Sequence, residues 1–402
     1  MSPAAVQVVR ALAATLAVQA MVTMATLTVP VFAPEAAGDI GLDAANIGIF
    51  ASLVYSGAMT ASLLSGGIVP RYGPIRMSQA GLLISIAALA LITTAWWPVL
   101  AVAGFLLGVG LGPATPGSSH ILARHTPARF SSLVFSIKQT GVPLGGMLAG
   151  ALVPLFVIEF GWRGASWAVA AMCLFCILAI HPTRRHFDIE LRAERQGLRG
   201  SVVGPLRLVL GHPVLRRLCF ASFFFAAIQQ CFSVFLVTYL VAGLGMGFVK
   251  AGLTLSIAQL SGIVGRIVWG GLSDWIGRPQ PVLGALGVAM GISGFVAAWF
   301  TPDWPYWAVV GVCIVLGATG VGWNGVFLSQ VARIAPGDRA SQATGGALFI
   351  TFFGVVTAPP IFGGIAALTG SFGHGFIVFA ALALVSGVAV LRGRPAAWKE
   401  ET

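Results

Sequence analysis

The sequence has few charged residues, and acidic residues are the scarcest of them. Only 9% of the 402 residues are charged, and just 12 residues are Asp or Glu. A soluble domain carries roughly 25% charged residues. The shortage excludes a soluble globular enzyme, and the 57% hydrophobic content excludes an intrinsically disordered chain.

Cysteine is also sparse and offers no framework for a metal or redox site. All five cysteines lie in apolar runs, and an odd number cannot all pair within one chain. Cys173 and Cys176 form a C-x-x-C pair, but reactive or metal-binding thiols need exposure and further ligands. No nucleophile–base pair is recognisable either. We therefore expect no enzyme activity, no cofactor and no metal.

The net charge of +11 does not indicate a nucleic-acid-binding surface. The cations form short clusters between apolar runs rather than one basic patch. Such clusters are typical of membrane topology signals. We therefore expect no nucleic-acid partner.

What the sequence has in abundance is long apolar runs. A bilayer core requires about 20 apolar residues per helix. Runs of this kind lie near residues 11–33, 47–69, 77–96, 98–122, 131–157, 164–181, 216–243, 248–272, 280–300, 305–331, 341–368 and 372–391. The pattern predicts an all-α membrane protein with twelve transmembrane helices in two pseudo-symmetric six-helix bundles.

The Lys and Arg residues are concentrated in alternate connections. If the N-terminus is cytoplasmic, the connections on the other side contain only Arg163 and Lys250, beside acids such as Glu35 and Asp303. Cytoplasmic loops are enriched in Lys and Arg. We predict a multi-pass plasma (inner) membrane protein with both termini cytoplasmic, surrounded by lipid and acting as a monomer.

The two halves repeat each other in sequence. Leu107-Gly108 matches Leu316-Gly317 at an offset of 209, and the connection after the second run resembles the one after the eighth. Between the halves lies an arginine-rich polar stretch. We predict an N-terminal bundle over 1–181, a cytoplasmic linker over 182–215 and a C-terminal bundle over 216–402, which is a transporter architecture.

The connection after the eighth run has the form G-x-x-x-D-x-x-G-R, with Gly270, Asp274, Gly277 and Arg278. This loop, with the span count and the linker, resembles the major facilitator superfamily over the whole chain. In that family the loop is a gating latch, in which glycine permits a tight turn and the Asp interacts with a helix N-terminus and an Arg. The alternative is a plain positively charged loop.

The first half contains a degraded copy of this latch. Arg71 and Gly73 are present, but Pro70 occupies the position of the Asp. We therefore predict gating residues in both loops, with a weakened latch in the first half.

Two cations lie inside the predicted spans and away from their ends, and no acid does. Lys138 and Arg266 each lie about seven residues, or 10 Å, from the cytoplasmic end of a span. Because an ionisable group inside a membrane is costly, a functional role is expected. A transported anion would supply the missing negative charge. The alternative is that one or both cations reach out to the interface.

Arg266 precedes the latch glycine Gly270 by four residues, which resembles the arginine of the organic-anion branches, the oxalate/formate antiporters and monocarboxylate transporters. In those branches the arginine clamps a carboxylate, which its planar fork suits. The oxalate branch also has a lysine in its eleventh span, where this chain has Leu348, Phe352 and Phe353.

Polar and aromatic side chains on helical stripes complete the predicted substrate site. Its members are Lys138, Arg266, Tyr55, Gln19, Gln259, Trp323, Asn324 and Phe327. Gln229 and Gln230 also interrupt the seventh run. Small polar residues serve equally well in helix–helix packing, so either role is open for each of them.

The sequence predicts a secondary active transporter for a small organic anion, a mono- or dicarboxylate, working by alternating access. Coupling is open between symport with protons and anion exchange (antiport). The alternative is a multidrug efflux antiporter, because Gly141-Val142-Pro143-Leu144-Gly145-Gly146 approaches the G-P-x-x-G-G signature of that group. That group also has an arginine where this chain has Gly104, and it uses membrane carboxylates. A receptor on the same scaffold is a third reading.

Overall fold

The computed structural model describes residues 3–40, 43–125, 134, 137–188, 203–335 and 340–393, which are helical apart from short connections. The first half contains α1 (Pro3–Ile40), α2 (Ala44–Tyr72), α3 (Pro74–Ile92), α4 (Trp97–Leu111), α5 (Ala114–His125), α7 (Gly141–Ile180) and the short α8 (Arg184–Phe187). The second half contains α9 (Val203–Gly211), α10 (Pro213–Thr238), α11 (Phe248–Ile276), α12 (Pro279–Ala298), α13 (Tyr306–Gly320), α14 (Asn324–Ile334), α15 (Ala340–Thr369) and α16 (Phe372–Arg392).

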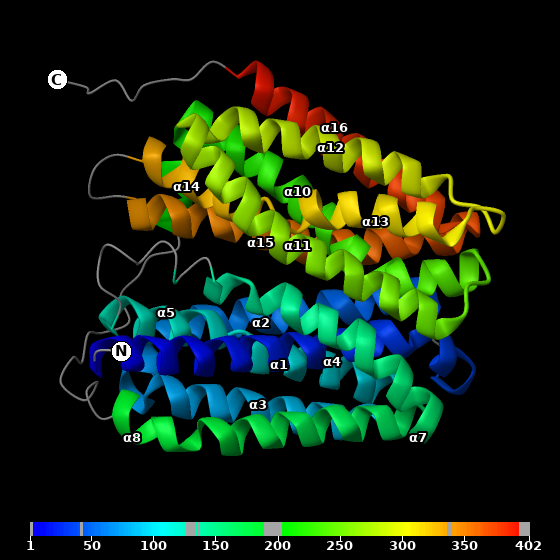
Figure 1. Cartoon of the computed structure of the whole chain (residues 1–402), viewed down its shortest axis with the longest axis horizontal. Helices are drawn as coiled ribbons and strands as arrows, with labels where there is room; N and C mark the ends of the chain where they lie inside the picture. Colours follow the sequence, from blue (N-terminus) through cyan, green and yellow to red (C-terminus); the bar gives the residue numbers. More distant parts are fainter. Residues whose placement is uncertain are drawn as a thin grey trace.

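These helices form twelve membrane spans in two six-helix bundles, which lie one above the other in Figure 1. Within the described ranges, nine helical segments are long and apolar enough to cross a membrane. One of them, α7, crosses twice because its backbone bends at Gly161, with φ 69° and ψ 171°. Helix α2 and the joined pair α4–α5 complete the twelve.

Two predicted spans are broken rather than continuous. The run 98–122 divides into α4 and α5 around Gly112 and Pro113, where proline lacks the N–H that a continuous helix needs. The run 305–331 divides into α13 and α14 between Gly320 and Asn324. The breaks lie at equivalent points of the sequence repeat, so the internal symmetry extends to the irregular backbone.

Part of the predicted linker is helical and packed. Helix α9 lies against α15. Gly346 permits this close approach, since a methyl group there would meet the backbone carbonyl of Pro205. Residues 189–202 of the linker lie outside the described part of the chain. The start of α1, the end of α16 and the short α8 lie at one end of the molecule, the left end of Figure 1, which we call the terminal end.

The two bundles meet mainly along two helix pairs, α7 with α11 and α2 with α15, and α10 also contacts α1 and α2. Backbones approach closely there because small residues face each other. Gly150 and Gly252 each face the other's carbonyl group, and Gly48 faces the carbonyl of Pro359. These contacts lie toward the end of the molecule opposite the terminal end, so the bundles are closed together there.

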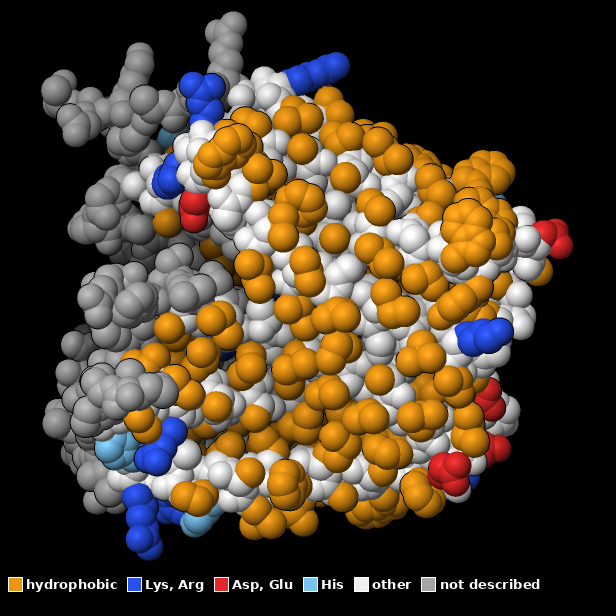
Figure 2. Space-filling view, viewed as in Figure 1, with side chains coloured by type: hydrophobic (Ala, Val, Ile, Leu, Met, Phe, Trp, Pro, Cys, Tyr) orange, Lys and Arg blue, Asp and Glu red, His pale blue; other side chains and the backbone are white. Residues whose placement is uncertain are grey.

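The surface has the polarity of a membrane protein. In Figure 2 hydrophobic side chains cover the middle of the visible face, Lys and Arg gather toward the terminal end, and Asp and Glu gather at the opposite end. At the opposite end Asp39 accepts hydrogen bonds from Trp162 Nε1 at 2.8 Å and from Arg163 Nη1 at 3.1 Å. The pair ties the end of α1 to the bend of α7.

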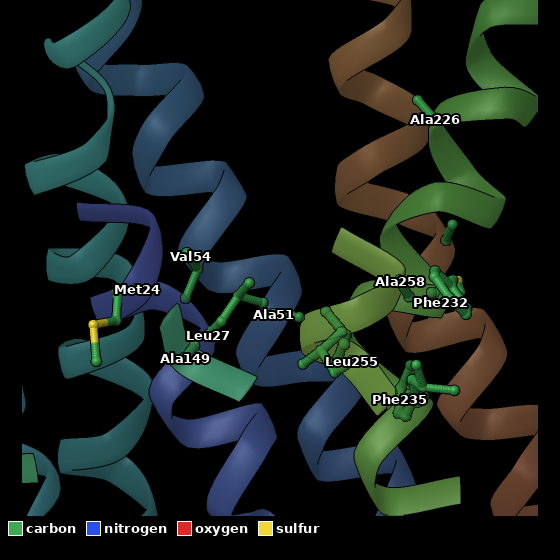
Figure 3. Close-up of a cluster of buried hydrophobic side chains, with 14 of the residues drawn as sticks. Met24, Leu27, Ala51, Val54, Ala149, Ala226, Phe232, Phe235, Leu255 and Ala258 are labelled. Atoms are coloured by element: carbon green, nitrogen blue, oxygen red, sulfur yellow. The ribbon is translucent and has the colours of Figure 1, made fainter. Parts of the chain in front are cut away.

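Among the nine segments long and apolar enough to cross a membrane, those of α1 and α10 are the most deeply buried. Figure 3 shows part of the apolar core, with Met24 and Leu27 of α1 in one bundle and Phe232 and Phe235 of α10 in the other. Polar residues on these two helices therefore face protein rather than lipid.

Candidate functional site

A cavity of about 590 Å³ lies between the two bundles. It reaches from mid-membrane residues such as Arg266 to Pro205 of α9 and Gly345 near the start of α15, and thus toward the terminal end. Its size is in the range of small-molecule sites. Four predicted ligand residues line it, namely Gln19, Tyr55, Arg266 and Asn324.

Arg266 bridges the two bundles where the α7–α11 contact ends and the cavity begins. Its Nε donates to the carbonyl oxygen of Val321 at 3.0 Å, and its Nη1 donates to that of Gln139 at 2.5 Å. The break between α13 and α14 exposes the Val321 carbonyl for this bond. A guanidinium has five N–H donors, so the two bonds leave donors for a ligand.

Lys138 is buried, with 1% of its surface exposed, and it is not among the residues that line the cavity. Its Nζ donates to Oε1 of Gln139 at 3.5 Å. Of the two predicted cations of the substrate site, Arg266 therefore lines the cavity and Lys138 does not, although Gln139 contacts both. Among the described ion pairs, none includes either cation.

Three other predicted residues are packed behind the cavity wall rather than in it. Trp323 and Phe327 are almost fully buried and have ring centroids 5.4 Å apart. Gln259 donates to the Ser233 hydroxyl at 3.1 Å. Trp323 supports the wall indirectly, because its Nε1 donates to Oε1 of Gln229 at 2.9 Å.

The sequence left the role of Gln229 and Gln230 open between cavity wall and helix packing, and both line the cavity from α10. It did not indicate the apolar part of the wall, which Leu348, Phe349, Phe352 and Val355 of α15 form. The glutamines had a signal, because amides interrupt an apolar span. Leu348, Phe352 and Val355 share a helical face by their spacing. In sequence, however, an apolar face that lines a cavity looks the same as one that faces lipid.

The predicted latch of the second half lies mostly within a helix. Gly270 and Asp274 belong to α11, Asp274 is exposed, and the turn itself is made by Gly277 with φ 69°. A left-handed glycine at this point is a common helix C-cap. The Gly277 carbonyl accepts a hydrogen bond from Arg333 Nη1 at 2.9 Å, and Arg278 is exposed.

The corresponding loop of the first half is closed by a residue outside the motif. Gly73 has φ 96°, and Asp188 Oδ1 and Oδ2 accept hydrogen bonds from the backbone N–H groups of Ile75 at 2.9 Å and Arg76 at 3.2 Å. Asp188 thus caps the N-terminus of α3. Arg71 is exposed, with its guanidinium over the ring of Tyr72.

Burial raises the pKa of Asp188 above its usual value, although the hydrogen bonds from Ile75 and Arg76 and two nearby arginines oppose the shift. The arginines are Arg76 and Arg184, each with Nε 4.0 Å from Oδ2. Two backbone hydrogen bonds and two arginines therefore fix the position of this carboxyl group at the terminal end.

Residues 14–359 match the family described as Major Facilitator Superfamily. A protein named probable hexose phosphate transport protein, from Chlamydia trachomatis, is 24% identical over 86% of this chain and 81% of its own length. The probable galactarate/D-glucarate transporter GudP of Escherichia coli is 23% identical over 90% of this chain and 88% of its own. The gentisate transporter of Corynebacterium glutamicum is 24% identical over 87% of this chain and 79% of its own.

Solved structures share the fold. A bacterial homologue of the human lysosomal transporter Spinster, in an inward-facing and unoccupied conformation, superposes with a TM-score of 0.75 at 15% identity, covering 98% of this chain and 100% of that one. The nucleoside transporter NupG superposes with a TM-score of 0.77 at 15% identity, covering 94% and 99%.

Proposed function

Because the chain belongs to the major facilitator superfamily, and is thus a membrane transporter rather than an enzyme, we propose that it carries a small organic anion by alternating access. The anion is a mono- or dicarboxylate. The two bundles rock around the cavity between them, and the described conformation has the cavity directed toward the terminal end.

One observation carries this proposal: Arg266 lines the cavity without an acidic partner among the described residues. A cation inside a membrane protein is costly unless its charge is compensated. A carboxylate substrate supplies that compensation in the bidentate geometry that guanidinium favours. Lys138 contributes through Gln139, which contacts both cations.

The charge distribution supports placing the terminal end in the cytoplasm. Lys and Arg dominate that end of the visible face, and positive residues are enriched in cytoplasmic connections. The chain is then a multi-pass protein of the inner membrane with both termini inside. The loops at Gly73 and Gly277 lie on this side and serve as its gating connections.

The substrates for which the relatives are named support an anion. Galactarate, D-glucarate and gentisate are carboxylates, and hexose phosphate is also an anion. The drug-efflux alternative loses its main support, because the glycines of its signature have packing roles. A side chain at Gly141 would meet Gln19, one at Gly145 would meet Ala20 and Thr23, and one at Gly146 would meet Gln259.

The test is uptake into proteoliposomes that contain the purified chain, with a panel of radiolabelled mono- and dicarboxylates. We expect Arg266→Gln to abolish uptake and Arg266→Lys to restore a fraction of it, because a single charge replaces a bidentate one. Lys250→Gln is the matched control, since Lys250 is exposed at the far end of α11. Uptake that persists at the wild-type rate in both Arg266→Gln and Lys138→Gln contradicts the proposal.

Coupling is tested in the same vesicles. Proton symport requires that a proton gradient directed into the vesicle accelerates uptake into empty vesicles. Anion exchange requires that uptake depends on preloaded substrate and ignores the gradient. No described cavity residue is a carboxylate, so we expect either exchange or a proton carried with the substrate.

A further inference from the structure

We infer that the substrate is a monocarboxylate with an apolar, ring-sized body, and not a sugar acid or a dicarboxylate. The inference rests on the proposed function, because it specifies which anion the cavity between the bundles accepts. Three properties of the cavity carry it: its charge, its hydrogen-bonding groups and its apolar wall.

The charge of the cavity matches one carboxylate. Among the described residues that line it, Arg266 is the only one that carries a full charge, and Lys138 lies outside the lining. A second carboxylate on the substrate has no cation in the wall to face. Burial of an uncompensated carboxylate is strongly unfavourable, so a dicarboxylate is selected against.

The hydrogen-bonding groups of the cavity are neutral amides and hydroxyls beside Arg266. The side-chain oxygens of three of its glutamines already accept hydrogen bonds within the protein: Gln19 accepts from the Thr115 hydroxyl at 3.2 Å and Gln139 accepts from Lys138. Gln229 accepts from both Trp323 and Asn324.

One buried hydroxyl of the cavity, that of Thr23, has no hydrogen-bond partner among the described residues. It can donate to an oxygen of a carboxylate. A polyhydroxylated acid instead presents several hydroxyl groups, and those that face the apolar wall find no partner.

The apolar wall comes from α15. Leu348, Phe349, Phe352 and Val355 form it, with Met59 of α2 and Leu328 of α14 beside them. Aromatic side chains favour stacked or edge-on contacts with another ring. This wall suits the body of a benzoate-like acid and leaves the hydroxyl groups of a sugar acid without partners.

The experiment is calorimetric binding to the purified chain at pH 8 with four probes that vary charge and body independently. These are benzoate, terephthalate, gluconate and glucarate, with benzamide as an uncharged analogue of benzoate. Binding is measured rather than flux because neutral benzoic acid itself crosses bilayers. We expect benzoate to bind most tightly and benzamide not to bind.

Variants locate the binding site. Phe349→Ala and Phe352→Ala should each weaken benzoate binding by roughly three- to tenfold, the range of an aromatic contact. Phe353→Ala is the matched control, because Phe353 neighbours Phe352 but does not line the cavity and is 53% exposed. Phe349→Leu and Phe352→Leu provide folded comparisons if an alanine variant loses its monodisperse elution profile.

The outcomes separate this inference from the proposed function. Tighter binding of gluconate, glucarate or terephthalate than of benzoate, lost in Arg266→Gln, overturns the substrate class and retains the organic-anion transporter. Benzoate binding that is equal in Phe349→Ala, Phe352→Ala and Phe353→Ala also overturns the substrate class. Binding of no carboxylate, or binding unchanged in Arg266→Gln, overturns the proposed function itself.

Discussion

The two loops that connect the second and third spans of each bundle solve opposite problems at the terminal end. In the first half, Asp188 accepts from the N–H groups at the start of α3. In the second half, Arg333 donates to the carbonyl of Gly277 at the end of α11. Each helix end is satisfied by a distant side chain of the charge that it attracts. The motif has Pro70 where an Asp is expected. Asp188, more than a hundred residues away in sequence, supplies a carboxylate to this loop instead.

The largest effect is expected at Gly73. Its φ of 96° and ψ of 143° are nearly exclusive to glycine, and an added methyl group would lie 2.5 Å from Cγ of Asp188. We expect Gly73→Ala to destabilise the first bundle by at least about 2 kcal/mol, seen as a lower melting midpoint in detergent. Gly204→Ala, at an open position of α9 with no positive φ, is the control. Equal midpoints for the two variants would remove the structural basis of the comparison.

Removal of the capping carboxylate should have the next largest effect. Asp188→Ala removes two hydrogen bonds to the N-terminus of α3, and loss of such a cap costs about 0.5–2 kcal/mol. The ion pairs to Arg76 and Arg184 add little, because these arginines are partly exposed. We expect a lower melting midpoint and faster amide hydrogen exchange at Ile75 and Arg76. Unchanged exchange at these amides would show that Asp188 does not cap the helix.

Gly277→Ala should be milder than Gly73→Ala. Gly277 has φ 69°, but an added methyl group meets nothing within 4 Å. The cost is then that of a left-handed alanine alone, about 1 kcal/mol. The melting midpoints of the two alanine variants measure the difference, and Gly271→Ala, also open but helical, is the control. A Gly277→Ala effect larger than that of Gly73→Ala would reverse the comparison.

The smallest effect is the pH dependence of the Asp188 cap. Its pKa is raised in the folded protein, so the folded state holds the proton more tightly than the unfolded state does. The contribution of Asp188 to the free energy of unfolding is therefore greatest at low pH. It falls as pH rises from about 4, the unfolded pKa, through the raised pKa, and is constant above it.

Asp188→Asn, which does not titrate there, measures this slope. The stability of the natural protein relative to Asp188→Asn should decline across that pH window and then level off. Melting midpoints of both proteins in matched buffers test it. A relative stability that rises with pH would show that the hydrogen bonds, and not burial, dominate the environment of the carboxylate.

Much of the fold could be predicted from the sequence because lipid imposes a length and a composition on each span. The apolar runs located all twelve spans. They did not indicate that two of the spans are broken, although the two breaks lie at equivalent points of the repeat. The division of α13 from α14 contains no proline, so no residue type marked it. The bend at Gly161 and the packing of α9 on α15 also depend on contacts that are remote in sequence.

The candidate site was predicted in part for the same reason. Arg266, Gln19, Tyr55 and Asn324 were recognisable as polar residues in apolar runs, and they do line the cavity. The direction of Lys138 could not be read, because a buried cation and a cavity cation have the same sequence signal. Asp188 was hidden by its position in a charged stretch, where only the folded chain brings it to α3.

The glycine contacts at the closed end have a consequence for the speed of the transport cycle. Gly48 with Pro359 and Gly150 with Gly252 meet backbone to backbone, so no long side chain has to leave a rotamer well when these surfaces part. The activation enthalpy of that separation then comes from shallow van der Waals contact, from lipid or water entry and from the hydrogen bond that the Ser256 hydroxyl donates to the Met147 carbonyl. If the proposed alternating access holds, the chain is expected to reorient with a small temperature coefficient at this end, and the bonds of Arg266 to Gln139 and Val321 are expected to limit its turnover.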